Sequence, residues 1–204
     1  GYSSAASDVY KRQGITYLGS FHNGFRQLTN SKHPVTKPED LKDLKIRVPG
    51  SAVYMGVFNA LGASPTAMSW SEVFTAIQQK TIDGQENGCS VTKSAKMDEI
   101  QQYMTIWNYS YENDLFVANS RVWESLDENT RQLLQECATE SCEWGRDHLE
   151  AEEDQLIQGF MDSGMQVDIL TEDQLQAFKD AVAGVTADLK AEYGEDACAA
   201  FGIN

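Results

Sequence analysis

The stretch KIRVPGSAVYMGVFNALG, residues 45–62, determines the fold class that the sequence predicts. Its first four residues alternate polar with β-branched side chains and end at Pro-Gly, which predicts a short strand over 45–48. Apolar residues then recur at four-residue spacing before Gly62, which predicts a helix that ends at this glycine. A strand followed at once by a helix is the repeating unit of α/β proteins, so we expect this class.

The same alternation of strands and helices extends to both sides of this stretch. We expect strands at 14–21, 64–68 and 81–83, and helices at 37–43 and 70–79. Two capping boxes, each a Ser or Thr followed by Glu three residues later, predict where these helices begin. They pair Thr36 with Glu39 and Ser69 with Glu72. We interpret the polar segment TIDGQENG, residues 81–88, as a strand fragment that ends in a turn at Gly84.

The second half of the chain has a different pattern. An extended stretch at 111–123 precedes a long helical pattern at 128–162, with Gly145 as the expected bend. At 1.5 Å per residue such a helix is roughly 50 Å long, which exceeds a small domain, so we expect it to connect two domains. A strand at 165–170 and a helix capped by Thr171 and Gln174 complete the pattern.

Composition excludes several classes of protein. The chain has 204 residues and a formal net charge of −15, which argues against nucleic-acid binding because phosphate contacts need clustered Lys and Arg. No apolar run approaches the roughly 18 residues that a membrane helix requires, and no signal peptide is visible. Residues 1–13 have no hydrophobic period and no cap, so we interpret them as a leader, a tag or a sequence-junction artefact and expect the native protein to begin upstream.

Metal binding and catalysis find little support in the motifs. The four cysteines form no C-x-x-C pair and the three histidines are far apart, so we expect no zinc site. We expect unpaired thiols, with a Cys89–Cys198 disulfide left open. No P-loop, G-x-S-x-G or H-E-x-x-H motif is present, and the acidic pairs are typical of solvated helix faces. We therefore expect no catalytic residues and no cofactor.

Two arginines are the candidates for an anion site. Arg47 lies near the end of a predicted strand, between two apolar residues that point the other way. The helix that follows begins at Ser51, and open α/β sheets bind ligands at the carboxyl ends of their strands. Arg26 also lies at a strand end. Either arginine could instead form a surface ion pair, Trp70 could belong to the core, and Asn87 could bond to the backbone of its turn.

Four segments in order carry a resemblance to a known family. They are NGFRQLTNSKHPV, KPEDLKDLKIRVPGS, GASPTAMSWSEVFTAIQQ and IDGQEN. The chain from residue 14 to 204 resembles the DctP-type solute-binding proteins of tripartite ATP-independent periplasmic (TRAP) transporters. The resemblance implies a periplasmic binding protein-like fold, with two α/β domains, a ligand cleft and a long domain-spanning helix. It also implies that the first domain is incomplete and that the signal peptide is lost with the missing N-terminus.

The resemblance assigns residue ranges to the parts of that fold. Residues 14–112 resemble the second domain, and 113–127 the segment that returns to the first. Residues 128–162 resemble the spanning helix, 163–204 the C-terminal strand and helices, and 1–13 lie outside the family.

The resemblance also implies roles for five residues. Arg47 matches the arginine that forms a bidentate salt bridge with the ligand carboxylate, and Asn87 matches an asparagine that bonds to the same group. Arg26 matches a second arginine of the cleft. Trp70 falls where the family has a ring on the ligand, and Ser51 lies near the ligand. Gly88 departs from the family pattern, because many members have Pro there.

The function implied is capture of an organic acid in the periplasm, without catalysis, and its delivery to a membrane permease by a monomer. Sugar acids such as uronates and C4-dicarboxylates both suit one carboxylate clamp, and Trp70 favours sugar acids because it could stack on a sugar ring. The alternative is a ligand-sensing module of the same fold that feeds a signalling receptor. An enzyme on a related scaffold is a third interpretation, for which no nucleophile–base pair exists.

Overall fold

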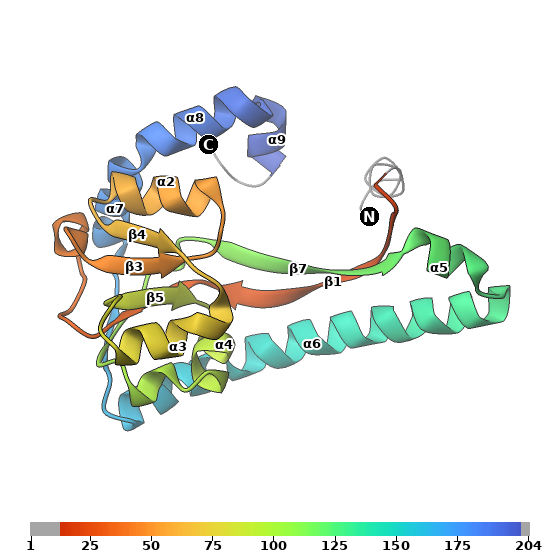
Figure 1. Ribbon diagram of the computed structural model, residues 1–204, viewed down its shortest axis with the longest axis horizontal. Coiled ribbons are helices and arrows are strands. Elements are labelled where there is room, and N and C mark those ends of the chain that lie inside the picture. Colours follow the sequence, from red (N-terminus) through yellow and green to blue (C-terminus); the bar gives the residue numbers. More distant parts are fainter. Residues whose placement is uncertain (1–12, 201–204) are drawn as a thin grey trace. The chain divides into compact units, whose positions relative to one another are not determined.

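The computed structural model describes residues 13–200 and contains two compact units (Figure 1). Unit 1 combines the chain up to Phe25 with Ser110–Gln155, and unit 2 combines Arg26–Tyr109 with the chain from Leu156 onward. The expected leader at 1–13 lies outside the described residues except for its last position. The chain thus passes between the units at three points, the third of them inside a helix.

A six-stranded mixed sheet forms the centre of unit 2, with the order β4-β3-β5-β2-β6-β8. The strands are β2 (Gln27–Asn30), β3 (Lys45–Val48), β4 (Ser64–Ala67), β5 (Gly84–Asn87), β6 (Tyr103–Ile106) and β8 (Gln166–Ile169). Strand β3 is parallel to β4 and β5, and β6 is parallel to β8, whereas β2 is antiparallel to its neighbours β5 and β6. The α/β class predicted from the sequence is confirmed.

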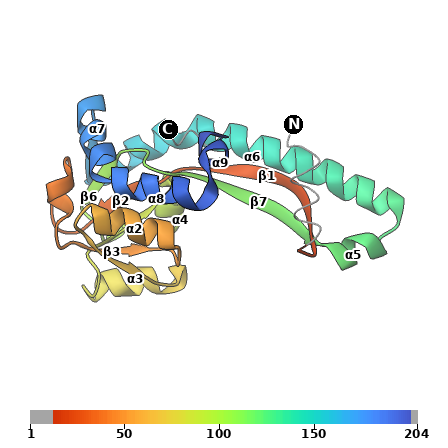
Figure 2. The ribbon, with the colours of Figure 1, turned by 90° about the horizontal axis from the view of Figure 1, so that it is seen from above.

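Helices cover both faces of this sheet (Figures 1 and 2). The helices and 3-10 turns that lie wholly in unit 2 are η1 (Pro38–Leu41), α2 (Ala52–Ala60), α3 (Trp70–Gln78), α4 (Cys89–Ser94), η2 (Met97–Glu99), α7 (Glu172–Ala181), α8 (Ala183–Tyr193) and α9 (Glu195–Ala200). On one face, Ile46 and Val48 of β3 pack with Phe58 of α2 and Phe178 of α7. A second apolar cluster forms around Val73 of α3 and a third around Phe160. Because strand side chains alternate, Arg47 faces away from Ile46 and Val48.

Unit 1 is a two-stranded antiparallel sheet with a long helix alongside it. Strand β1 (Ile15–Phe25) pairs with β7 (Tyr111–Asn119), which leads into α5 (Ser120–Ser125) and then into α6 (Glu128–Asp162). Helix α6 has the bounds that the sequence predicted, and its residues up to Gln155 belong to unit 1. Cys142 of α6 packs so closely on Gly19 that a Cβ there would lie 2.8 Å from its sulfur.

The segment GQEN at 84–87 is β5, an interior strand of the sheet, so its interpretation as a turn was wrong. All four residues are buried. Gly84 allows this because a Cβ there would collide with the backbone oxygen of Thr29 in β2. Side chains from other segments bond to Glu86 and to the Gln85 side-chain nitrogen, as described below. The expected strand over 81–83 is instead a bend.

Two of the three predicted capping boxes are absent. The first helix is a single 3-10 turn, and the Asp40 carboxylate accepts bonds from the backbone nitrogens of Thr36 and Lys37, at 3.0 and 3.2 Å, rather than Glu39. Ser69 makes no side-chain cap, because its hydroxyl bonds to that of Ser71 at 3.1 Å.

The third capping box, Thr171 with Gln174, is confirmed. The helix that it starts is divided, because α7 ends before Val182 and α8 begins after it.

Several expectations about the chain as a whole can be compared with residues 13–200. None of the four cysteines, all within this range, forms a disulfide bond, so the Cys89–Cys198 bridge is not formed. Within that range no group of three His, Cys, Asp or Glu side chains is arranged to hold a metal ion. Among the described helices, none combines the length and the apolar character that crossing a bilayer requires.

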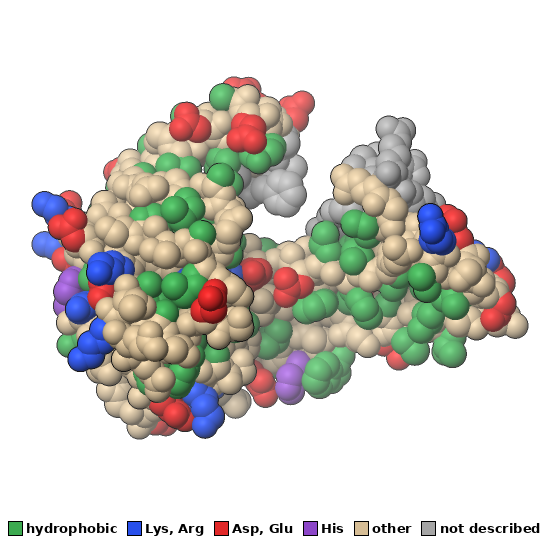
Figure 3. Space-filling model, viewed as in Figure 1, with side chains coloured by type: hydrophobic (Ala, Val, Ile, Leu, Met, Phe, Trp, Pro, Cys, Tyr) green, Lys and Arg blue, Asp and Glu red, His purple; other side chains and the backbone are tan. Residues whose placement is uncertain are grey.

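On unit 1, apolar side chains gather at the surface (Figure 3), among them Leu115, Phe116 and Trp144.

Candidate functional site

The five candidate residues lie along one edge of the unit 2 sheet. Arg47 is the third residue of β3 and Asn87 is the last residue of β5, which run in parallel. Ser51 and Trp70 come shortly after the carboxyl ends of β3 and β4. Arg26 precedes β2, whose first residue pairs with Asn87 because β2 is antiparallel to β5. The carboxyl edge of a parallel sheet is where α/β proteins bind ligands.

Arg47 is buried, with only 5% of the residue exposed, and its side chain is held in a defined orientation. Its Nε and Nη2 atoms donate to the backbone oxygen of Met68, at 2.9 and 2.8 Å. The guanidinium carbon lies 5.3 Å from the centroid of the Trp70 ring, which is within the range of a cation–π contact. These two contacts fix the guanidinium plane at the end of β3.

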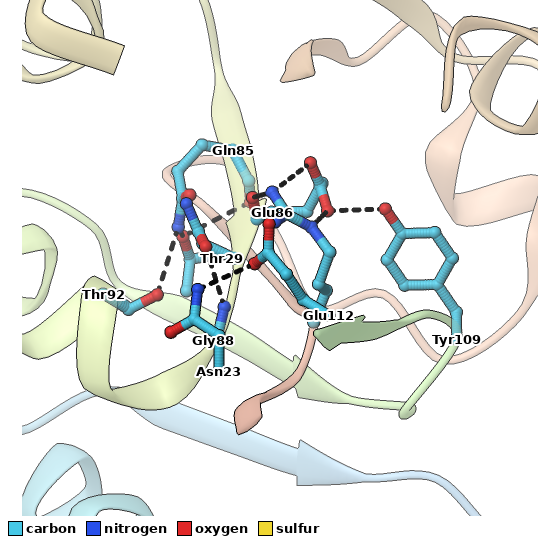
Figure 4. Close-up of polar contacts among 10 residues, drawn as sticks. Asn23, Thr29, Gln85, Glu86, Gly88, Thr92, Tyr109 and Glu112 are labelled. Atoms are coloured by element: carbon cyan, nitrogen blue, oxygen red, sulfur yellow. Dashed lines mark hydrogen bonds and ion pairs between the residues drawn. The ribbon is translucent and has the colours of Figure 1, made fainter. Parts of the chain in front are cut away.

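Asn87 presents an amide at the end of β5. Its Oδ1 atom accepts from the backbone nitrogen of Gly88 at 3.0 Å (Figure 4). Only 7% of the residue is exposed, and its Nδ2 atom donates to no group among the described residues. Among the described residues, Nδ2 is not one of the fully buried polar atoms that lack a partner, so it is open to solvent and can donate to a ligand oxygen.

Arg26 forms an ion pair that the sequence did not predict. Its Nε and Nη2 atoms donate to the Glu86 carboxylate at 2.5 and 2.9 Å, and Nη2 also donates to the Glu86 backbone oxygen at 2.8 Å. The guanidinium carbon lies 5.2 Å from the Tyr54 ring centroid. Only 2% of Arg26 is exposed, so it is a buried, paired cation rather than an open surface charge.

Tyr109 completes this cluster by donating its hydroxyl to the Glu86 carboxylate at 2.5 Å (Figure 4). Burial raises the pKa of Glu86 above its usual value, while the bonds from Arg26 and Tyr109 and the charge of Arg47 act in the opposite direction. Burial, followed by the Glu86 charge, raises the pKa of Tyr109 well above its usual value. The hydroxyl therefore stays protonated and remains a donor at neutral pH.

On the opposite face of β5, Gln85 anchors a buried polar network (Figure 4). Its Nε2 atom donates to the hydroxyls of Thr29 and Thr92, at 2.8 and 3.5 Å. Thr29 in turn donates to Gln101 at 2.5 Å. Each of the four residues is at most 1% exposed. This network provides partners for the Gln85 side-chain nitrogen inside the sheet, as Arg26 and Tyr109 do for Glu86 on the other face.

Ser51 and Trp70 flank Arg47 without being fully buried. Ser51 is the residue before α2, and its hydroxyl makes no cap with that helix. Trp70 begins α3, and its ring packs partly against the Val73 cluster in addition to its contact with Arg47. Trp70 is thus both a core residue and a neighbour of the arginine, so the two interpretations of this residue are compatible.

Three contributors to the site were not identified from the sequence. Glu86 fell within the segment that we interpreted as a turn, and the sequence did not single out Tyr109 or the Met68 carbonyl at all. Glu86 lies 60 residues from Arg26 along the chain and 23 from Tyr109. The one available signal was an acidic residue inside IDGQEN, which would need a cation if that segment were a buried strand.

The arrangement suits the binding of an anion. Two buried guanidinium groups and one amide donor lie at one edge, against one carboxylate, so the local charge favours an added negative group. A hollow of about 910 Å³ lies elsewhere, in unit 1 between Phe21, Phe116 and Trp144, and none of the five candidates lines it.

The model of one protein family matches this chain over residues 2–192, and its description is bacterial extracellular solute-binding protein, family 7 (DctP). The match begins at residue 2 and so includes most of the segment that we placed outside the family. A curated relative, the 2,3-diketo-L-gulonate-binding periplasmic protein YiaO of Escherichia coli, is 33% identical over 87% of this chain and 53% of its own length.

Two solved structures have the same fold. A TRAP periplasmic solute-binding protein from Ralstonia eutropha, with bound (S)-2-acetolactate, is 33% identical with a TM-score of 0.90, over 95% of this chain and 64% of that one. Another TRAP periplasmic solute-binding protein, from Shewanella oneidensis with bound succinate, is 34% identical with a TM-score of 0.89. The match covers 94% of this chain and 63% of that one. The chain spans about half the length of the curated relatives that it matches.

Proposed function

The chain belongs to bacterial extracellular solute-binding protein family 7, and from this premise we propose that it forms the carboxylate-binding part of a TRAP transporter subunit. That subunit captures an organic acid outside the cytoplasm and delivers it to the membrane permease. The observation that carries the proposal is Arg47, a buried guanidinium at the carboxyl edge of the sheet, held by Met68 and Trp70.

The ligand carboxylate binds at Arg47 in this proposal, and Asn87 donates a further bond from its Nδ2 atom. A guanidinium matches the two oxygens of a carboxylate and stays charged at every physiological pH. Because Arg47 is already restrained, little side-chain entropy is lost on binding. Arg26 adds positive charge to the same edge, although Glu86 offsets part of it. Ser51 follows the carboxyl end of the Arg47 strand, and in this proposal its hydroxyl bonds to a ligand hydroxyl.

The ligand class is an organic acid with at least one carboxylate. One relative is named for a sugar acid and a solved relative contains the dicarboxylate succinate. We favour a sugar acid, because the partly exposed Trp70 ring beside Arg47 suits contact with the apolar face of a sugar. In this proposal the protein acts in the periplasm as a monomer, with the permease subunits as its partners and no catalytic step.

Calorimetric titration with galactonate and with succinate tests the proposal. We expect Arg47→Ala to weaken binding by about 30-fold or more, since loss of one partner of a buried charge pair costs at least about 2 kcal/mol. Arg47→Lys should recover only part of the affinity, because it keeps the charge and loses the fork. Arg146→Ala, which removes an exposed arginine of α6, is the control. An unchanged dissociation constant in Arg47→Ala would refute the proposal.

The sensor alternative shares this site and differs in its partner. Co-purification of the ligand-loaded protein with TRAP permease subunits supports transport. Association with a receptor kinase in place of the permease would instead support the sensor.

A further inference from the structure

Asn87 is followed by glycine, which is the residue that least hinders attack on a preceding side chain. Gly88 has no Cβ, so its backbone nitrogen is sterically accessible. This nitrogen lies 3.0 Å from the Asn87 side-chain oxygen and donates its hydrogen to it. The side-chain carbon is bonded to that oxygen, so the potential nucleophile lies next to the amide carbonyl that it would attack.

We propose that Asn87 is a site of spontaneous deamidation, and that this reaction inactivates the anion site. The Gly88 nitrogen forms a bond to the Asn87 side-chain carbon, and the bond from that carbon to Nδ2 breaks. Ammonia leaves with the proton from the Gly88 nitrogen, and a five-membered succinimide remains. Water then opens the ring at either carbonyl, which gives aspartate or isoaspartate at position 87. No oxidant, reductant or enzyme is required.

The consequence follows from where Asn87 lies. Its Nδ2 atom leaves in the reaction, so the edge loses the amide donor that we assign to the ligand. A carboxylate takes its place at the end of β5, and the isoaspartate form also lengthens the backbone in a strand paired to Gln27. A buried like charge repels an incoming anion and so weakens its binding. This second part of the inference rests on the proposed function, whereas the chemical step does not.

The chain contains a second Asn-Gly pair that serves as an internal reference. The Asn23 side-chain nitrogen donates to the Glu112 carboxylate at 3.0 Å, within unit 1. Among residues 13–200, the Asn23 side chain makes no hydrogen bond to the Gly24 nitrogen, in contrast to Asn87 and Gly88. The two pairs share the Asn-Gly dipeptide, so a faster reaction at Asn87 in the folded protein is not explained by the dipeptide itself.

Gly88→Pro is the variant that blocks the reaction while suiting the backbone angles at this position. Proline has no backbone N–H and therefore cannot act as the nucleophile. Gly88 has φ −60° and ψ 155°, which a proline adopts without strain. The preceding residue lies in a strand, the conformation that proline favours before it. Gly88→Ala keeps the nitrogen and adds a methyl group, so we expect an intermediate rate.

The experiment is peptide mapping by mass spectrometry after incubation of the folded protein at mildly alkaline pH. We expect aspartate and isoaspartate to accumulate at position 87 faster than at 23, more slowly in Gly88→Ala, and not in Gly88→Pro. Equal rates at 87 and 23, or an intact Asn87 while Asn23 reacts, would overturn the assignment. So would a rate at 87 that is unchanged in Gly88→Pro.

The effect on binding is measured separately, by titrating galactonate into Asn87→Asp and into aged wild-type protein. We expect affinity to fall by about 100-fold in Asn87→Asp, and the fraction of active sites in aged protein to fall in step with the deamidated fraction. Aged Gly88→Pro should retain its sites. Deamidation that leaves galactonate affinity unchanged would contradict the loss of function while the chemical assignment stands.

Discussion

The guanidinium of Arg26 makes a two-bond ion pair with the carboxylate of Glu86, and both side chains lie inside the protein. The Nε–Oε2 and Nη2–Oε1 distances are 2.5 and 2.9 Å, and the two side chains are 3% and 0% exposed. Removing two charges from water is costly, and the cost is recovered only when the geometry is good and the remaining polar atoms are bonded. The Glu86 carboxylate meets this condition, because it also accepts a hydrogen bond from the Tyr109 hydroxyl.

Arg26→Gln should destabilise the protein strongly at neutral pH. The change leaves Glu86 as a buried carboxylate without its cation, which costs about 3–5 kcal/mol in comparable pairs. Denaturant unfolding followed by circular dichroism measures this loss. The loss should shrink at acidic pH, because Glu86 then takes up a proton. Arg146→Gln, which breaks an exposed pair, is the control and should change stability by less than about 1 kcal/mol. A pH-independent loss would contradict the role of the Glu86 charge.

The pH dependence of stability should carry a signature of Glu86. Its folded pKa is raised above the usual 4.5, so the folded protein binds this proton more tightly than the unfolded chain. The resulting stabilisation is fully present below the unfolded pKa and is lost as pH rises through the folded pKa. Unfolding free energies over a pH series should therefore decline in that window. Glu86→Gln removes the titration and should flatten the decline, and an identical slope in the variant would contradict it.

Tyr109→Phe should act on the same carboxylate without touching either charge. It removes the hydroxyl that donates to Glu86, a bond to a charged group worth about 1.5–3 kcal/mol. Because this bond lowers the pKa of Glu86, its loss should move the decline in stability to higher pH. Tyr103→Phe is the matched control, since that hydroxyl bonds to none of the described residues. Equal effects of the two changes would indicate a role for the ring alone.

The sequence predicted those elements of the fold whose structure is decided by residues close together in the chain. The β-branched KIRV segment became β3 with the predicted bounds, and the long helix at 128–162 also matched. The Thr171–Gln174 box formed because both partners lie within one turn. In each case the contacts that define the element are close in sequence. The position of Arg47 at the end of its strand followed from the same local pattern.

The sequence failed where distant side chains decide the structure. GQEN resembles a turn because three of its residues are polar, whereas in the strand Arg26 and Tyr109 bond to Glu86, and Thr29 accepts from the Gln85 side-chain nitrogen, from other segments. Local propensity does not encode such contacts, so β5 could not be recognised from its own residues. Ser69 is a different case, because its hydroxyl bonds to that of Ser71 only two residues further on, so two local patterns compete there.

Gly84→Ala adds one methyl group to β5 and should strongly reduce the stability of the protein. A Cβ at this position would overlap the backbone oxygen of Thr29 and lie 2.9 Å from the Cβ of Asn30. The obstacle is the backbone of the paired strand β2, which cannot move without breaking the sheet next to Asn87 and Arg26. We expect a loss of about 3 kcal/mol, the upper part of the range for overpacked cores, measured as a shift in the denaturant midpoint.

Gly159→Ala in α6 provides the opposite result for the same chemical change. Nothing lies within 4 Å of a Cβ built at Gly159, and alanine favours a helix interior by about 0.5–1 kcal/mol over glycine. We therefore expect a small gain in stability there and a large loss at Gly84. If the two alanines changed the midpoint alike, the close approach of β5 to β2 would be absent, and with it the register that aligns Asn87 with Gln27 beside Arg26.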